Sequence, residues 1–482
     1  MNSLATSPAG AAAYADPAQA LADLLDHQKQ AFLKRPMPSA AERIERLKKL
    51  QAMLLDQKDA IAAAINQDYG NRSVHETLIG ELMTCVDQIK YSIKNLPKWM
   101  QPSRRHINPM HQPAKGWVRY QPMGVVGIMT PWNYPLLLSM GPLICALSAG
   151  NHAMIKMSSA SPALGALMEK ELAEIFPSSL VAVVNGGGAV SDAFCRLPFD
   201  QLTFTGSTSV GKTVMAAAAE NLTPVLLELG GKSPAVIHPS MPMLDAAERL
   251  TFGKFWNAGQ TCVAPDYAFV PRGKSQEFIE AMRQMFSKGY PTLRDNPDYT
   301  SIINDKQYRR LRGYLDDARE KGAVLHEFNP ANESLDGTRK LAPVMITNTT
   351  PDMLVCQDEL FGPLLVVHEY DHIDQVVDYI TRRPRPLAMY YFDYDEARGL
   401  ALSERVHSGH FGINQVITHV AQDDLPFGGI GASGMGKYHG HEGFLTMSHA
   451  RSVMVRPKMY VMRAILPPFG LVQNLLIKAA LR

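Results

Sequence analysis

The chain has 482 residues, with 48 Lys and Arg against 46 Asp and Glu, so its formal net charge is +2. This length exceeds what one hydrophobic core usually supports and predicts two or three domains. The balanced charge, without a basic stripe interleaved with aromatic residues, argues against nucleic-acid binding and favours a small neutral or weakly charged ligand.

Five cysteines occur in the chain, an odd number without short pairwise spacing. Neither CxxC pairs nor Cys/His clusters are found, which argues against a disulfide framework and predicts no metal site. The first twenty residues are rich in Ala, Ser and Pro but lack a basic start and an apolar core, so they favour a disordered lead over a secretory signal. We therefore expect a reducing, cytoplasmic location.

The first third of the chain has helical periodicity. Apolar residues recur at spacings of three, four or seven from Ile44 to Ile65, after the candidate N-cap Ser39, and a second helix is expected over residues 74–99. Beyond Pro102 the pattern becomes extended through residues 117–120. This change predicts a ribbon outside the main fold, suited to contacts in an oligomer.

From Gly124 onward, short apolar runs alternate with helical patterns. The expected strands are 125–129, 153–156, 181–184 and 201–205, and the expected helices are 137–147, 164–175 and 212–220. Such alternation is typical of a parallel sheet wrapped by helices. Dinucleotide binding is the natural hypothesis for a sheet of this kind.

The expected turn 206–211 carries Gly206 and Gly211, which would let backbone N–H groups face an anionic ligand at the positive end of a helix. The turn does not match GxGxxG, and a glycine at such a junction is structural more often than it binds phosphate. Lys156 ends another expected strand, where this type of sheet exposes ligand-binding groups; a solvated lysine is the simpler interpretation of that residue alone.

Three residues carry the chemistry that the sequence suggests. Cys262 is a thiol in small, polar surroundings, and Glu228 is a carboxylate before a Gly-Gly turn; such a pair can form and hydrolyse a thioester. Asn133 lies between two prolines that hold the backbone extended, and a fixed amide of this kind stabilises an oxyanion. The other four cysteines are interpreted as packing residues: Cys85, Cys145, Cys195 and Cys356. The glycine-dense segment 425–436 is interpreted as a substrate-side or interface loop.

With these motifs in order, the chain resembles the NAD(P)-dependent aldehyde dehydrogenases over roughly residues 40–450. The shared motifs are Pro-Trp-Asn-Tyr-Pro at 131–135, Phe-Thr-Gly-Ser at 204–207, Leu-Glu-Leu-Gly-Gly-Lys at 227–232, Gly-Gln-Thr-Cys at 259–262, Glu-Leu-Phe-Gly-Pro at 359–363 and Pro-Phe-Gly-Gly at 426–429. Segments 262–267 and 434–440 are similar to the class 3-like branch, and segments 69–73 and 295–304 resemble coniferyl aldehyde dehydrogenases.

The resemblance implies an α/β aldehyde dehydrogenase fold in three parts and a tail. A Rossmann-like NAD(P)-binding domain would comprise 1–105, with the N-terminal helices, and 124–229; an α/β catalytic domain would comprise 230–425. Residues 106–123 and 445–465 would form a β oligomerisation ribbon, followed by a C-terminal tail over 466–482. A homodimer is the implied assembly.

The resemblance also implies a role for each site residue. Cys262 would be the nucleophile, Glu228 the base that activates the hydrolytic water, and Asn133, with the Cys262 backbone N–H, the oxyanion hole. NAD would contact Lys156 at the adenosine ribose, Ser207 beside Gly206 at the pyrophosphate, Glu359 and Phe361 at the nicotinamide ribose and ring, and Trp132 and Leu229 along its length. Ser159 replaces a glutamate that often binds the 2′-hydroxyl, so we expect NADP to be accepted as well as NAD.

The expected activity is oxidation of an aldehyde to the acid, with coniferaldehyde or another aromatic aldehyde as first choice and a medium- or long-chain aliphatic aldehyde as second. A catalytically silent structural relative would be expected to lose the nucleophile or the base. An acylating enzyme that uses coenzyme A commonly lacks the base, so Glu228 disfavours it. The tail is too short and polar for a membrane span, and a helix over 471–481 is expected to dock onto the protein or its dimer mate rather than a membrane.

Overall fold

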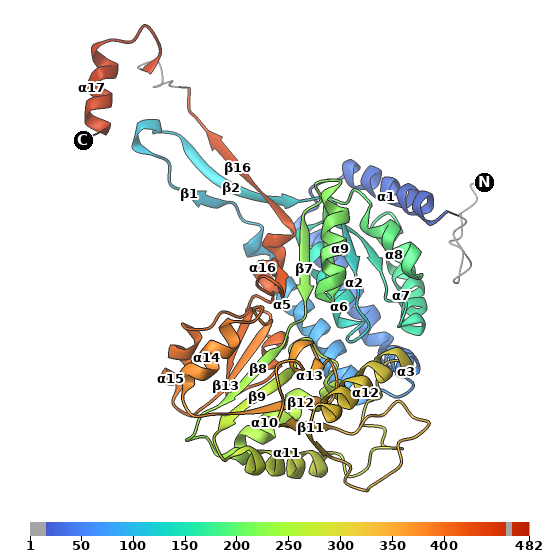
Figure 1. Cartoon of the computed structure of the whole chain (residues 1–482). Coiled ribbons are helices and arrows are strands. Elements are labelled where there is room, and N and C mark those ends of the chain that lie inside the picture. The colour runs from blue at the N-terminus through green and yellow to red at the C-terminus, as the bar shows by residue number, and fades with distance from the viewer. Residues whose placement is uncertain (1–15, 459–464, 482) are drawn as a thin grey trace, which may run out of the picture.

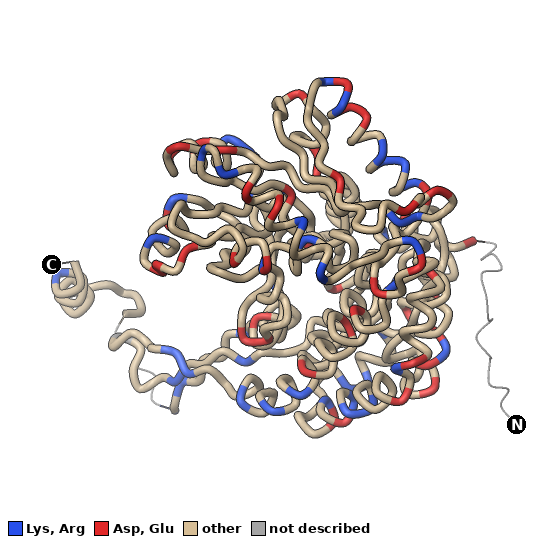
Figure 2. The backbone as a smooth tube through the Cα atoms, turned by 90° about the horizontal axis from the view of Figure 1, so that it is seen from below, with Lys and Arg blue, Asp and Glu red and all other residues tan. Residues whose placement is uncertain are grey.

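Three β-sheets organise the molecule, and two of them lie between helices in the main body (Figure 1). The computed structural model describes residues 16–458 and 465–481. The sheets have six, seven and three strands. This is an α/β architecture, as the alternating strand and helix patterns predict. Figure 2 shows acidic and basic residues interspersed around the body, in agreement with the balanced composition.

The N-terminal segment forms a series of helices. These are α1 (Pro17–Lys34), α2 (Ala40–Asp56), α3 (Lys58–Tyr69), α4 (Val74–Thr77), the π-helix η1 (Leu78–Met83) and α5 (Thr84–Trp99). Of these, α1 packs on the six-stranded sheet, and α2, α3 and α5 pack on the helices that follow. Ser39 caps α2 in a capping box with Glu42, as predicted. The expected helix over 44–65 is instead two helices that meet at Gln57.

The expectation of a disordered lead is wrong for residues 17–20, and its first fifteen residues lie outside the described part of the chain. Helix α1 begins at Pro17 because the Asp16 side chain accepts hydrogen bonds from the backbone N–H groups of Ala18 and Gln19. Leu21 and Leu25 then bury one face of this helix in a hydrophobic cluster with residues of the six-stranded sheet.

The six-stranded sheet has the order β15-β7-β6-β3-β4-β5. Its strands are β3 (Val125–Met129), β4 (His152–Lys156), β5 (Val181–Val184), β6 (Gln201–Gly206), β7 (Val225–Leu229) and β15 (Gly434–Met435), with helices α6 (Leu137–Ala149), α7 (Pro162–Ile175), α8 (Gly188–Cys195) and α9 (Thr208–Ala219). All pairs are parallel except β15 with β7. The predicted strands are thus confirmed in place.

One boundary in this sheet differs from the prediction. Helix α9 begins at Thr208 rather than at Lys212, because the Ser207 side chain accepts a hydrogen bond from the Val210 N–H and caps the helix. Gly211 therefore lies in the first turn of α9 and not in the preceding loop. A Cβ at Gly211 would be 2.6 Å from a methyl group of Leu229, so this glycine allows α9 to pack closely on β7.

The seven-stranded sheet has the order β10-β11-β12-β9-β8-β13-β14, and only β10 is antiparallel to its neighbour. Its strands are β8 (Ser233–Ile237), β9 (Pro265–Pro271), β10 (Val324–Glu327), β11 (Val344–Thr347), β12 (Leu364–Tyr370), β13 (Ala388–Phe392) and β14 (His410–Ile413). The accompanying helices are α10 (Met243–Phe255), α11 (Ser275–Gly289), α12 (Asp305–Glu320), α13 (Leu354–Gln357), α14 (Ile373–Thr381) and α15 (Glu396–Ser403), and α16 (Gly440–Thr446) follows.

The third sheet is an antiparallel ribbon that extends away from the body, as the change of pattern after Pro102 predicts (Figure 1). It pairs β2 (Lys115–Pro122) with β1 (Ser103–Arg105) and β16 (Ser448–Val455). Helix α17 (Leu471–Ala480) stands at the far end of the ribbon, and none of its residues is buried. Within the described part of the chain, α17 is therefore not docked on the body.

Across residues 16–458 and 465–481, no helix combines the length and the apolar composition that a membrane crossing requires.

Candidate active site

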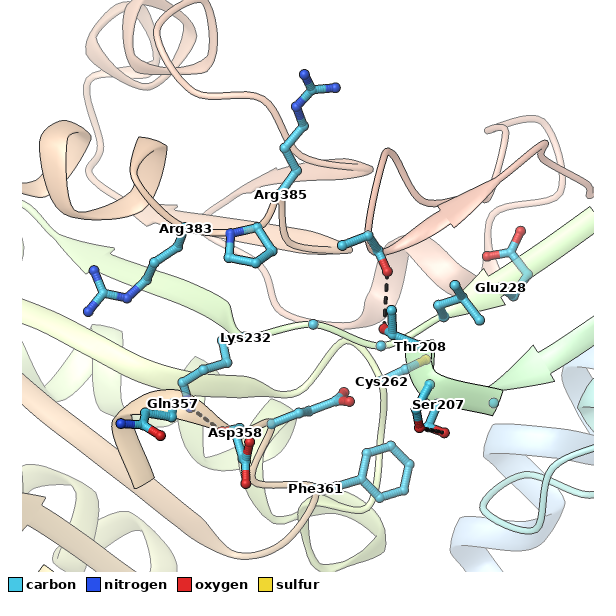
Figure 3. A pocket seen from close by; sticks show the side chains of 18 of the residues that line it. Ser207, Thr208, Glu228, Lys232, Cys262, Gln357, Asp358, Phe361, Arg383 and Arg385 are labelled. Atoms are coloured by element: carbon cyan, nitrogen blue, oxygen red, sulfur yellow. Dashed lines mark hydrogen bonds between the residues drawn. The ribbon is translucent and has the colours of Figure 1, made fainter. Parts of the chain in front are cut away.

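A pocket of about 1050 Å³ lies where β6 and β7 of the six-stranded sheet meet elements of the seven-stranded sheet (Figure 3). Nine of the predicted site residues line it: Trp132, Asn133, Gly206, Ser207, Glu228, Leu229, Cys262, Glu359 and Phe361. Lys156, Ser159 and Gly211 are not among the lining residues. Within the described part of the chain, no three His, Cys, Asp or Glu side chains gather as metal ligands would.

The Cys262 thiol reaches this pocket through an unusual turn. The preceding residues Asn257, Ala258 and Gly259 all have positive φ values, of 53°, 49° and 73°. A Cβ at Gly259 would overlap the carbonyl oxygen of Gly362, so only glycine fits that position. Cys262 is half-buried, whereas the other four cysteines are buried, as their interpretation as packing residues predicts.

Burial favours the uncharged forms of both reactive groups. Burial raises the pKa of the Cys262 thiol to about 12, and the nearby carboxylates of Glu359 and Glu228 raise it too. Burial also raises the pKa of Glu228 well above its ordinary value. Neither carboxylate oxygen of Glu228 has a hydrogen-bond partner among the described residues. The Glu228 carboxyl group is therefore available to a water molecule or a substrate in the pocket.

The glycine-dense segment after residue 425 fixes the strand that carries Glu228. Gly434 pairs with Glu228 across β15 and β7, and the Leu229 N–H donates to the Ser433 carbonyl at 3.0 Å. A side chain at Gly434 would overlap the Leu227 carbonyl oxygen, and its φ is 151°. The segment therefore contains a short strand, which the expectation of an irregular loop did not include.

Hydrogen bonds fix both the side chain and the backbone carbonyl of Asn133. Its side-chain Nδ2 donates to the Gln260 carbonyl at 3.2 Å. Its own carbonyl accepts hydrogen bonds from Arg72 Nη1 at 2.7 Å, Tyr69 Oη at 2.9 Å and Asn257 Nδ2 at 3.0 Å. In the sequence, Arg72 and Tyr69 stand out only as part of segment 69–73, which resembles coniferyl aldehyde dehydrogenases. Their contacts with Asn133 span more than sixty residues of chain, and periodicity does not reveal them.

The other side of the pocket contains the N-terminus of α9, where three hydroxyl side chains are adjacent. The Ser207 and Ser209 hydroxyls are 3.1 Å apart, and the Thr208 hydroxyl donates to the Ala432 carbonyl at 3.1 Å. Lys212 also lines the pocket. Free N–H groups, hydroxyls and the helix dipole suit a phosphate group. These residues, in a pocket of this size, fit the pyrophosphate of a dinucleotide.

Lys156 is buried at the end of β4, so its interpretation as a solvated lysine is wrong. Its Nζ donates to the Met157 carbonyl at 2.7 Å and the Gly186 carbonyl at 2.8 Å. Burial lowers its pKa to about 8. Ser159 is exposed three residues further along, on the surface between β4 and α7.

Glu359 and Phe361 form the wall of the pocket next to Cys262. Burial and the neighbouring Asp266 together raise the pKa of Glu359 to about 8, against the lowering effect of a hydrogen bond from the Gly231 backbone. The Phe361 ring packs edge-on against Trp132, with ring centroids 5.3 Å apart. In Figure 3, Phe361, Cys262 and Ser207 surround the same space.

Comparison with known proteins identifies the family. The model of the aldehyde dehydrogenase family matches residues 4–453. A probable coniferyl aldehyde dehydrogenase of Pseudomonas aeruginosa is 52% identical over 460 residues, which cover 95% of this chain and 96% of the relative. A coniferyl aldehyde dehydrogenase of a Pseudomonas species, strain HR199, is 44% identical over 91% of both chains.

Solved structures agree with these sequence matches. The substrate-bound state of Staphylococcus aureus AldH has a TM-score of 0.90 at 34% identity, covering 96% of this chain and 99% of that chain. The NAD+ complex of an aldehyde dehydrogenase from Bacillus cereus has a TM-score of 0.83 at 25% identity, covering 92% and 89%. This chain belongs to the aldehyde dehydrogenase family and is an NAD(P)-dependent aldehyde dehydrogenase.

Proposed function

We propose that this enzyme oxidises an aromatic aldehyde of the cinnamyl type, such as coniferaldehyde, to its carboxylic acid, with Cys262 as nucleophile and Glu228 as base. One observation carries the assignment of roles. The half-buried Cys262 thiol and the Glu228 carboxyl group, which has no hydrogen-bond partner among the described residues, line the same pocket. Asn133 also lines this pocket, and hydrogen bonds fix its side chain and its carbonyl.

In the first half of the reaction, the Cys262 sulfur bonds to the aldehyde carbon while its thiol proton passes to solvent water. The carbonyl π electrons move to oxygen, where the Asn133 side-chain N–H and the Cys262 backbone N–H stabilise the negative charge. Ser207, Glu359 and Phe361 would hold the nicotinamide dinucleotide, which when bound accepts a hydride from the substrate carbon. The Trp132 ring against Phe361 encloses this part of the pocket.

In the second half, Glu228 takes a proton from a water molecule, and the water oxygen attacks the thioester carbon. The carbon–sulfur bond breaks, the acid leaves, and the Cys262 sulfur takes up the proton that Glu228 removed from the water. Burial without a hydrogen-bond partner raises the pKa of Glu228, which makes its carboxylate a stronger base than an exposed glutamate. A catalytically silent relative and a coenzyme A-dependent acylating enzyme are disfavoured because both Cys262 and Glu228 are present.

Apolar side chains on η1 and just before the Cys262 turn, outside the lining of the pocket, support a bulky substrate. Trp256, six residues before Cys262, packs edge-on against Phe252 with centroids 5.1 Å apart and contacts Gly80 of η1. Phe252, Ile79 and Met83 are 43%, 49% and 54% exposed. Exposed apolar side chains in one region mark binding surfaces, and each Å² of apolar surface buried contributes about 25 cal/mol. The names of the two Pseudomonas relatives favour coniferaldehyde within this class.

The test is a comparison of kcat/KM for coniferaldehyde, octanal and acetaldehyde. We expect coniferaldehyde and octanal both to exceed acetaldehyde, because both bury more apolar area, and coniferaldehyde to exceed octanal, as the names of the two Pseudomonas relatives favour. The variants Phe252→Ser and Met83→Ser should reduce the preference for coniferaldehyde, whereas Leu222→Ser, at a residue that is 89% exposed in the turn after α9, should not. Equal specificity constants for coniferaldehyde and acetaldehyde would contradict the substrate class without affecting the roles of Cys262 and Glu228.

The proposed assembly is a cytoplasmic homodimer in which the ribbon of β1, β2 and β16 meets a second copy. The ribbon extends from the body, and Met454 and Val455 on β16 are about half exposed, at 48% and 49%. Leu471, Leu475 and Ile477 of α17 are exposed as well, so a partner chain rather than its own body would cover this helix. Light scattering on the full chain and on a chain ending at Pro467 tests this: we expect a dimer for the full chain.

A further inference from the structure

The Tyr-Gly-Asn-Arg-Ser segment at 69–73 has no role in the mechanism above, yet its arginine is one of the largest fully buried side chains of the protein. Arg72 lies between the rings of Tyr69 and Tyr134, with its guanidinium carbon 5.0 and 4.9 Å from their centroids. Its Nη2 is 3.3 Å from Glu81 Oε1. Burial lowers the pKa of Arg72, but Tyr69 and Glu81 raise it by more, so the guanidinium stays charged.

The guanidinium aims its other terminal nitrogen at a single backbone atom. Arg72 Nη1 donates to the Asn133 carbonyl oxygen at 2.7 Å, the shortest of the three hydrogen bonds to that oxygen. A carbonyl oxygen has two lone pairs, so three donors saturate it, and a charged donor contributes about twice as much as a neutral one. Arg72 therefore holds the backbone of Asn133, and this fixes the position from which the Asn133 side chain extends.

The same arginine also fixes the chain on the far side of Asn133. Glu81, its ion-pair partner, uses Oε2 to accept hydrogen bonds from the N–H groups of Leu136 at 2.8 Å and Leu137 at 3.1 Å. The residues between Asn133 and the start of α6 are thus tied at both ends to one buried pair. Glu81 reaches them from η1, a π-helical turn, and such turns are frequent at functional sites.

The Asn133 amide is further aligned with the Cys262 turn. Asn257 Nδ2 donates hydrogen bonds to the carbonyl oxygens of both Asn133 and Gln260. The Gln260 carbonyl oxygen also accepts a hydrogen bond from Asn133 Nδ2. Gln260 is itself fixed by hydrogen bonds to Ser301 and Ile303. Arg72 therefore anchors one side of a polar network whose other side carries the nucleophile.

We propose that Arg72 is a positioning residue for the oxyanion site: by fixing the Asn133 carbonyl, it sets the direction of the Asn133 side-chain N–H toward the oxygen of the substrate. This inference rests on the proposed role of Asn133. Arg72 does not line the pocket and does not touch the substrate. Its effect on the reaction passes through Asn133 alone.

The experiment is a double-mutant cycle on steady-state turnover of coniferaldehyde with NAD. Asn133→Ala removes the oxyanion donor and should lower kcat by about 10²- to 10³-fold. Arg72→Lys, which keeps the charge against Glu81, should lower kcat by about 10- to 100-fold with little change in KM. The double variant should be no slower than Asn133→Ala, because Arg72 acts only through Asn133.

Two controls separate positioning from general damage to the fold. Arg43→Lys alters another fully buried arginine, which bonds to the Ser148 and Ala149 carbonyls at the end of α6, and should leave kcat unchanged. The rate at which iodoacetamide alkylates Cys262 needs the thiol but no oxyanion hole, so Arg72→Lys should leave it unchanged. Tyr69→Phe removes one neutral donor from the same carbonyl and should lower kcat by about 2- to 10-fold.

The outcomes are distinct. If Arg72→Lys slows alkylation and turnover equally, Arg72 is structural and the inference is wrong. If Arg72→Lys lowers kcat further in the Asn133→Ala background, it acts by another route and the inference is wrong. If Asn133→Ala itself retains full kcat, the proposed oxyanion role fails first, whatever Arg72 does. Should Arg72→Lys not fold, Tyr69→Phe carries the same test, and its failure to lower kcat would contradict the inference.

Discussion

The carboxylate of Glu359 occupies the space that a side chain at Gly230 would need. A Cβ placed on Gly230 would overlap both carboxylate oxygens of Glu359, and the backbone of the next glycine, Gly231, hydrogen-bonds to the same carboxylate. The Gly-Gly pair after β7 therefore leaves room for the Glu359 carboxylate and hydrogen-bonds to it. It links the strand that carries Glu228 to the wall of the cofactor side of the pocket.

Gly230→Ala should displace Glu359 and weaken cofactor binding. If Glu359 bonds to the nicotinamide ribose, losing that hydrogen bond costs about 0.5–1.5 kcal/mol at neutral pH, which corresponds to roughly a 2- to 10-fold rise in KM for NAD. Gly188→Ala is the matched control, because a Cβ there meets nothing within 4 Å. An unchanged KM for NAD in Gly230→Ala, with a raised KM in Glu359→Gln, would contradict the steric argument.

The thiol of Cys262 should react slowly at neutral pH in the free enzyme. Burial and the carboxylates of Glu359 and Glu228 raise its pKa to about 12, so the reactive thiolate is a small fraction at pH 7 and increases about tenfold for each pH unit. We expect the alkylation rate with iodoacetamide to rise continuously from pH 7 to pH 10. Above about pH 8, where Glu359 is ionised, Glu359→Gln removes a negative neighbour and should speed alkylation.

Mass spectrometry of the alkylated peptide identifies Cys262 as the modified residue, and Cys262→Ala supplies the background rate. A rate that levels off near pH 7 would show that the thiolate is already formed and that the electrostatic account is wrong. The four buried cysteines should remain unmodified while the protein is folded, because the reagent cannot reach them.

Glu228→Gln should separate the two halves of the reaction. Attack by Cys262 does not need the Glu228 carboxylate, but hydrolysis of the thioester does, and loss of a positioned general base costs about 10²- to 10⁴-fold in rate. We expect a burst of reduced cofactor close to one per active site, followed by slow turnover. Intact-protein mass spectrometry should then detect the acyl group on Cys262; the absence of both burst and acyl-enzyme would rule out Glu228 as the base.

The wild-type enzyme should show the matching pH dependence. Because burial raises the pKa of Glu228, the carboxyl group is protonated and inactive as a base below that pKa, and the deacylation rate should increase as pH rises through it. Single-turnover deacylation, measured after rapid mixing to different pH values, reports this step alone. In Glu228→Gln the rise should be absent.

Much of the fold was predictable because its strands are short, continuously apolar and buried on both faces. Strands β3 to β6 are nearly all buried, so hydrophobicity alone locates them. The start of α9 was misplaced because the prediction gave weight to the glycines, whereas the Ser207 cap decides where that helix begins. Gly211 is required by packing on Leu229, a contact that no local pattern contains.

Site residues divide in the same way. Cys262, Glu228 and Asn133 stand in distinctive local motifs, so the sequence was sufficient to select them as candidates. Arg72 and Glu81 are charged residues on helical or turn segments, where a solvated surface is the usual expectation. Their burial depends on the ion pair between them and on the carbonyl of Asn133, all of which come together only in the folded chain.

Cofactor choice is expected to depend on Ser159, which stands three residues after Lys156 on the exposed segment between β4 and α7. The Lys156 ammonium already donates to the Met157 and Gly186 carbonyls, which leaves one proton for a ligand. A glutamate at 159 would accept hydrogen bonds from a ribose diol and would repel a 2′-phosphate. Serine lacks that repulsion, so the wild type should use both NAD and NADP, with NAD preferred.

Ser159→Glu should therefore lower the ratio of kcat/KM for NADP to that for NAD, by about tenfold if the two charges approach to contact distance in a partly solvated site. Ser159→Gln, which has the same length without the charge, is the control: it should leave the ratio near the wild-type value. Because Ser159 lies outside the lining of the main pocket, its side chain must reach the ribose from the rim. If Ser159→Glu and Ser159→Gln give the same ratio as the wild type, Ser159 does not approach the ribose and the discrimination arises elsewhere, with Lys156 the next residue to vary.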